Sequence, residues 1–227
     1  MGPTAITGMT ITTDLQVGQP TDAALPAASP LHLILLASPA FPVGGFSFSE
    51  GLEADILRWQ LALKNVANDI NIEVLSGWIC DQLQLTLARG DLAVIAHAVP
   101  AWRGGHVNRI TDLSDWLLQT RETSELRAQT EQMGRSLCNW LVNLEDIDAA
   151  KLNHCTELPP TYPIAYAPAA VQTEAGIRDC LLAYAFGWAK NMVQAANFPE
   201  TERQAFSPML KILSSQHETQ YSRLFRS

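Results

Sequence analysis

The sequence predicts an all-α fold: one helical, bundle-like domain of about eight helices, with a flexible N-terminal arm and a C-terminal tail. From residue 31 onward, apolar residues recur at steps of three and four, which is typical of amphipathic helices. No run outside the arm alternates convincingly with the two-residue period of a strand. A chain of 227 residues, 47% of them hydrophobic, is also long enough to bury one sizeable core.

The first part of the chain contains a predicted arm and, over 72–99, two predicted helices. Residues 1–29 are rich in Thr, Gly, Pro and Ala, with little to bury, and form the predicted arm. One apolar stripe over 72–89 predicts a helix that stops at Gly90, and it consists of Leu75, Trp78, Ile79, Leu83 and Leu87. Asp91 then opens a short apolar helix over 92–99, which Pro100 is expected to end.

The second part of the helical domain, which we expect to extend over 30–214, holds the strongest periodicity. A helix is predicted to begin near Asp112, and another covers 124–144. The apolar positions of the latter are Leu126, Met133, Leu137, Trp140, Leu141 and Leu144. Four prolines predict a long connection over 148–169, followed by a helix over 173–197 with Leu181, Tyr184, Trp188 and Met192 on one face. Thr201 and Gln204 have the spacing of a capping box and start a last helix.

Charge and composition exclude several classes of function. A net charge of −8 repels phosphate backbones, so that nucleic-acid binding is not expected. The chain has neither a signal-peptide pattern nor an apolar run of about 18 residues, so we expect a cytoplasmic protein that does not contact membranes. The four cysteines lack the C-x-x-C spacing and the histidines lack the H-E-x-x-H motif, so no tight metal site and no cofactor are predicted.

The segment 38–53 combines prolines, glycines and a helix start. Gly44 and Gly45 turn the chain, and Ser47 with Glu50 forms a capping box that predicts a helix from about Phe48. The remaining motif residues are Ser49 and Gly51. A nucleophile elbow would need glycine at Ser49 and a preceding strand, which disfavours a serine hydrolase here.

The alternative function is a stand-alone hydrolase, which would use either Ser47 or a metal site at His154 and Cys155. Adjacent side chains in a loop diverge, so that the second pair is a weak candidate for a ligand set.

Two further segments carry charged groups in a pattern that suits contact with a protein. On a helix, Arg121 and Glu125 would be neighbours four residues apart, within a block that also holds Glu122 and Arg127. The C-terminal segment 215–227 is unusual for a terminus because it keeps apolar groups beside arginines. The apolar groups are Tyr221, Leu224 and Phe225; Arg223 precedes Leu224, and Arg226 follows Phe225. Aromatic and arginine residues are typical anchors of interfaces, so we expect the tail to bind a partner.

Together, the 36–53 motif, the 121–127 block followed by Met133 and Gly134, and the ending at 217–227 resemble the UreF family of urease accessory proteins. The resemblance covers about residues 31–227 and departs from the family pattern at 198–204, where a usual glycine is missing, and at Phe48, which is often tyrosine. It implies an all-α fold that dimerises and has no catalysis of its own.

The resemblance also implies partners. Proteins of this family bridge UreD (UreH in some organisms) and the GTPase UreG, and together they load nickel into urease apoprotein. The tail is then expected to dock on UreD/UreH through His217, Glu218, Tyr221, Arg223, Leu224, Phe225 and Arg226. The candidate residues facing the GTPase are Arg121, Glu122, Glu125 and Arg127.

Overall fold

The computed structural model describes residues 32–33, 35–36, 52–62, 72–143, 153 and 161–196. These residues form an all-α fold without a strand, as the sequence predicts. The α-helices with both bounds in these ranges are α2 (Leu52–Ala62), α3 (Ile72–Gln82), α4 (Asp91–Gly104), α5 (Val107–Thr120), α6 (Ser124–Val142), α8 (Tyr162–Val171) and α9 (Ile177–Ala195). The predicted N-terminal arm, the helix after Thr201 and the C-terminal tail lie outside the described residues.

The centre of the fold is α8, where the sequence predicts only a connection; that prediction was wrong. Pro163 stands in the first turn of α8, where its missing N–H removes no helical hydrogen bond. Pro168 lies three residues before the helix ends. Every side chain over 163–170 is buried, mainly against α4 and α6, so the helix is apolar all round and shows no periodic stripe.

The prediction that Pro100 ends the helix that starts at Asp91 was also wrong, because this helix, α4, continues to Gly104. Pro100 is exposed near the last turn of α4. Its missing N–H removes only one of the last hydrogen bonds of this helix. The helix is capped instead by Gly105, whose φ of 67° is left-handed and suits glycine. The His106 N–H then bonds to the carbonyl of Ala101 at 2.9 Å and closes the helix end.

The predicted helix over 72–89 contains α3 followed by a π-helical turn, η2 (Leu83–Leu87). Its wider turn is marked by the Ala88 N–H, which bonds five residues back to the carbonyl of Leu83 at 2.9 Å. Apolar residues four apart drift around an ordinary α-helix, and the wider turn corrects this drift. Leu83 and Leu87 therefore both remain buried in the core.

The helices α5, α6 and α9 match the predictions in type, and α5 and α9 differ from them in their starts. α5 begins at Val107, five residues before the predicted position, and its Trp116 is exposed. α6 agrees closely with the predicted range, and α9 begins at Ile177 after a turn in which Glu174 has a φ of 57°. Leu181, Tyr184, Trp188 and Met192 are buried, as predicted for α9.

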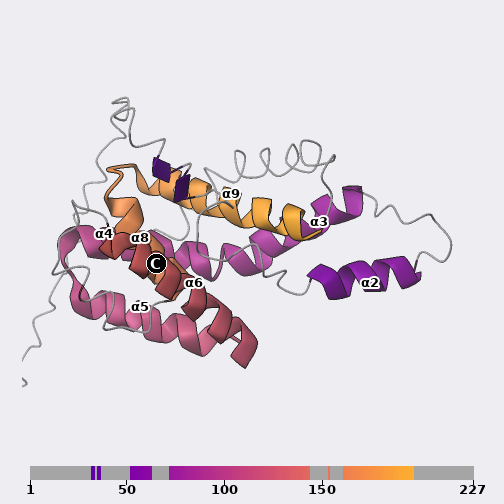
Figure 1. Cartoon of the computed structure of the whole chain (residues 1–227), viewed down its shortest axis with the longest axis horizontal. Helices are drawn as coiled ribbons and strands as arrows, with labels where there is room; N and C mark the ends of the chain where they lie inside the picture. Colours follow the sequence, from indigo (N-terminus) through magenta and orange to yellow (C-terminus); the bar gives the residue numbers. More distant parts are fainter. Residues whose placement is uncertain are drawn as a thin grey trace, which may run out of the picture.

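One apolar core joins these helices, as the sequence predicts. Figure 1 shows α4 with α9 along one side and α5 along the other, while α6 crosses near α8. This arrangement brings the amino end of α4, the α5–α6 connection and the middle of α9 together.

Candidate functional site

The charged block 121–127 forms the connection between α5 and α6. Arg121 ends α5 in an extended conformation, with φ −75° and ψ 115°. Thr123 caps α6, and its hydroxyl accepts a hydrogen bond from the Leu126 N–H at 3.2 Å. The expectation that Arg121 and Glu125 are neighbours on one helix was therefore wrong, because the chain changes direction between them.

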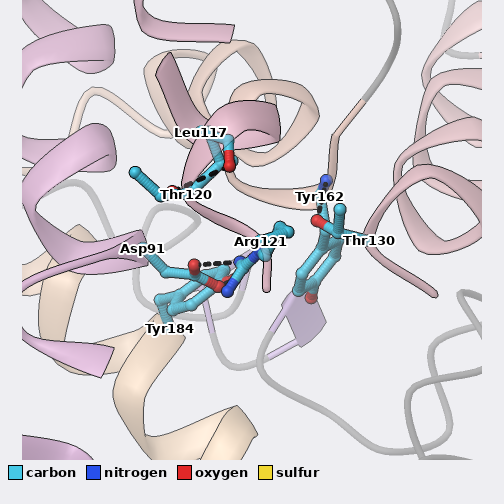
Figure 2. Close-up of polar contacts among 7 residues, drawn as sticks. All are labelled: Asp91, Leu117, Thr120, Arg121, Thr130, Tyr162 and Tyr184. Carbon is cyan, nitrogen blue, oxygen red and sulfur yellow. Dashed lines mark hydrogen bonds and ion pairs between the residues drawn. The ribbon is translucent and has the colours of Figure 1, made fainter. Parts of the chain in front are cut away.

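Arg121 instead turns inward to Asp91, the first residue of α4 (Figure 2). One Nη of the guanidinium donates to Oδ1 of Asp91, while the Tyr184 hydroxyl donates to Oδ2 at 2.7 Å. The side chains of Arg121 and Asp91 are only 19% and 13% exposed. The three residues, here called the Asp91 network, connect α4, the α5–α6 connection and α9.

The local sequence explains why an aspartate occupies this place. Gly90 is the cap of α4, so the Asp91 carboxylate lies in the first turn, where the helix dipole favours negative charge. A buried carboxylate still needs partners for its oxygens, and the guanidinium and the phenol provide one each. The network thus has both charge and hydrogen bonding satisfied at its carboxylate.

Tyr184 also belongs to a cluster of three tyrosines beside the network. The ring centroid of Tyr184 lies 5.3 Å from that of Tyr162 and 5.0 Å from that of Tyr166, the latter pair meeting edge to face. The Tyr162 N–H donates to the hydroxyl of Thr130 on α6 at 3.2 Å, which Figure 2 also shows. The hydroxyl of Tyr166 donates to the carbonyl of Cys180 at 2.9 Å, away from Asp91.

The outer side of the block carries the remaining charges. Glu122, Glu125 and Arg127 are exposed, and Nε of Arg127 donates to the backbone carbonyl of Arg121 at 3.2 Å. Hydrogen bonds from the backbone of Glu125, then from the side chains of Thr123 and Ser124, lower the pKa of the Glu125 carboxyl. Of the four predicted residues, Arg121 therefore points into the protein and the other three lie at the surface.

Burial raises the pKa of all three tyrosines, with a contribution from the Asp91 charge at Tyr162 and Tyr184. Burial is also the main reason that the pKa of the Cys180 thiol rises to about 11. Each group therefore holds its proton in the folded chain at a pH where the unfolded chain releases it.

We expect the free energy of unfolding to fall as pH rises. The fall begins near pH 9, where the thiol of Cys180 ionises in the unfolded chain, and steepens near pH 10, where the tyrosines ionise. Below these values the stabilisation is fully present, and each group contributes a slope of about 1.4 kcal/mol per pH unit above them. Urea denaturation across this pH range measures the slope. Tyr184→Phe removes one of these groups and should reduce the slope above pH 10 by about 1.4 kcal/mol per pH unit.

The other predicted site residues fall where the structure gives no description. The motif over 44–51, the pair His154 and Cys155, and the tail residues over 217–226 lie outside the described ranges. Within the described ranges, no three His, Cys, Asp or Glu side chains gather as a metal site would require. The helices described there also include none with the length and apolar character needed to cross a membrane.

Sequence reasoning missed Asp91 and Tyr184 as members of the site. Asp91 was recognisable as a helix start after Gly90, and Tyr184 as part of the buried face of its helix. No spacing rule links positions that are 93 residues apart, so their hydrogen bond could be found only in three dimensions.

Comparison with known proteins finds relatives over most of the chain. The UreF family model matches residues 71–197, which include the Asp91 network and the charged block. A urease accessory protein UreF from Polaromonas sp. (strain JS666) is 57% identical over 236 aligned residues, covering 90% of this chain and 97% of its own length. Those from Paracidovorax citrulli and Methylibium petroleiphilum are 51% and 49% identical, over 89% and 88% of this chain and 91% and 95% of theirs. The chain belongs to the UreF family of urease accessory proteins.

Proposed function

We propose that this chain is a non-catalytic scaffold that bridges UreD/UreH and the GTPase UreG during nickel insertion into urease. The observation that carries the proposal is its extensive identity to UreF proteins, together with a match of the family model to the helical body. The urease apoprotein is then engaged through the complex rather than by this chain alone. The assembly acts in the cytoplasm, without nucleic acid or membrane.

The helical body supports a scaffold role because its helices are fixed to one another by buried contacts. The Asp91 network and the tyrosine cluster connect α4, α6, α8 and α9, and one apolar core lies among them. A body held in this way can present a surface of constant shape, which reduces the entropic cost of binding. We assign the GTPase-facing surface to Glu122, Glu125 and Arg127 and give Arg121 a supporting role beneath it.

The C-terminal segment supplies the second contact of the bridge. Tyr221, Leu224 and Phe225 are large apolar groups, and Arg223 and Arg226 add donors for carboxylates. Such a segment suits insertion into an apolar groove of UreD/UreH. We also propose that two copies of the chain associate, a proposal that rests on the family resemblance and the low content of charged residues, 17%.

Nickel is the cargo of the assembly and needs no resident site in this chain. A protein that passes a metal ion onward must bind it weakly enough to release it. For the alternative hydrolase function, by contrast, neither the relatives nor the described residues offer support. The urease accessory proteins that match the chain favour a chaperone over an enzyme.

Co-purification tests the bridge. A tagged form of the full chain, produced together with UreD/UreH and UreG, should retain both partners through washing, and each partner should also be retained when the other is left out. Loss of either partner from any mixture that contains it would contradict a bridging role. An unrelated tagged helical protein, which has no counterpart of the 215–227 segment, serves as the control for nonspecific capture.

A further inference from the structure

The surface charges and the buried network are joined by one residue. Arg121 contributes its side chain to Asp91 and its backbone carbonyl to Nε of Arg127, at 3.2 Å. The chain of contacts therefore runs from the Tyr184 hydroxyl through Asp91 and Arg121 to an exposed guanidinium. Because Arg121 is in an extended conformation between two helices, its carbonyl lies outside the helical hydrogen-bond ladders and accepts from Nε of Arg127, while its side chain pairs with Asp91.

Within the described part of the chain, Arg127 uses only one side of its guanidinium. Its guanidinium uses Nε within the chain, and no acceptor among the described residues takes a hydrogen bond from its Nη groups. The neighbouring acid on α6, Glu131, pairs with Arg135 at 3.2 Å instead. An arginine held at Nε presents a planar group of donors that matches the two oxygens of a carboxylate.

The charges around Arg127 indicate which oxyanion it binds. Glu122 and Glu125 are both exposed in the same block, and the chain carries a net charge of −8. This field opposes a polyanion such as a nucleotide phosphate more strongly than a singly charged carboxylate. A partner surface with two basic side chains followed by one acidic side chain complements the acid–acid–base order of Glu122, Glu125 and Arg127.

We propose that Arg127 binds a carboxylate on the surface of the GTPase. Asp91 and Tyr184 are positioning residues, which fix the orientation of the Arg127 guanidinium through Arg121. The inference rests on the proposed function, because it names the residues by which the scaffold meets its GTPase. It assigns to a buried network a measurable effect on binding at the surface.

A double-mutant cycle on the full chain tests this coupling, with affinity for the purified GTPase as the readout. Arg127→Ala should weaken binding about ten-fold or more, and Arg127→Lys nearly as much because lysine keeps the charge but lacks the planar group. Tyr184→Phe removes one hydroxyl and should weaken binding about three- to ten-fold. In the Arg127→Ala background, Tyr184→Phe should have no further effect.

The control is Tyr166→Phe, which removes a buried hydroxyl of the same tyrosine cluster that bonds to the carbonyl of Cys180 rather than to Asp91. It should lower thermal stability and leave GTPase affinity unchanged. Equal weakening by both tyrosine variants, or additive effects of Tyr184→Phe and Arg127→Ala, would overturn the coupling.

The source of the oxyanion is decided by repeating the measurement without nucleotide. A carboxylate partner predicts that Arg127→Ala weakens binding equally for the nucleotide-free and the GTP-bound GTPase. An effect seen only with nucleotide would overturn the carboxylate assignment. If the unaltered chain did not bind the GTPase at all, the proposed function itself would fail, which is a different result from an additive cycle.

Discussion

Replacing Arg121 with methionine is expected to lower the free energy of unfolding by about 3 kcal/mol. The substitution preserves most of the side-chain volume but leaves the Asp91 carboxylate, 13% exposed, without its cationic partner. The cost comes from an uncompensated buried charge rather than from a lost contact alone. Urea denaturation monitored by circular dichroism measures the change, with two-state behaviour checked by a second probe.

Two comparisons make this prediction specific. Arg135→Met removes the same type of residue from an exposed pair, with side chains 54% and 32% exposed, and should cost no more than about 0.5 kcal/mol. Combining Arg121→Met with Asp91→Asn removes the stranded charge, so the double variant should be more stable than Arg121→Met alone. If Arg121→Met were as mild as Arg135→Met, the Asp91 network would not be a principal support of the fold.

Ending the chain after Gln220 is expected to weaken capture of UreD/UreH on the order of 100-fold, while leaving the helical body folded. The truncation removes Tyr221, Leu224 and Phe225, the apolar groups that we assign to the partner groove. A binding assay with purified UreD/UreH measures the affinity, and circular dichroism reports whether the helical content is kept. In cells, urease maturation should fall to the background seen without the accessory protein.

A pair of point substitutions separates the apolar anchors from the length of the tail. Phe225→Ala should weaken capture by about ten-fold or more, because buried aromatic anchors dominate such interfaces. Ser222→Ala, in the same segment, should change it little. Full-strength capture by the chain that ends at Gln220 would show that UreD/UreH binds elsewhere.

The sequence predicted the amphipathic helices well and failed for the helix that has no polar face. The strong stripes of α6 and α9 identified the buried positions Leu137 and Tyr184, since a helix at the surface of a core must separate apolar from polar residues. In α8, Pro163 and Pro168 were read as breakers because no stripe opposed that reading. A helix surrounded by others needs no stripe, so only packing against α4 and α6 shows its place.

The candidate site was predictable in composition and not in geometry. The charged residues singled out the block over 121–127, yet their four-residue spacing paired Arg121 with Glu125 on one helix, which the structure does not contain. The true partner, Asp91, lies 30 residues earlier in the chain. Local rules describe neighbours along one helix, whereas this ion pair depends on how α4 and the α5–α6 connection meet.

Reconstitution from purified components tests the scaffold role most directly. UreG and UreD/UreH are mixed with or without this chain, and the mass of each eluting complex is measured by light scattering after gel filtration. A bridging role predicts that UreG elutes together with UreD/UreH only when the chain is present, and that the chain ending at Gln220 carries UreG alone. Association of UreG with UreD/UreH to the same extent without this chain would contradict the account.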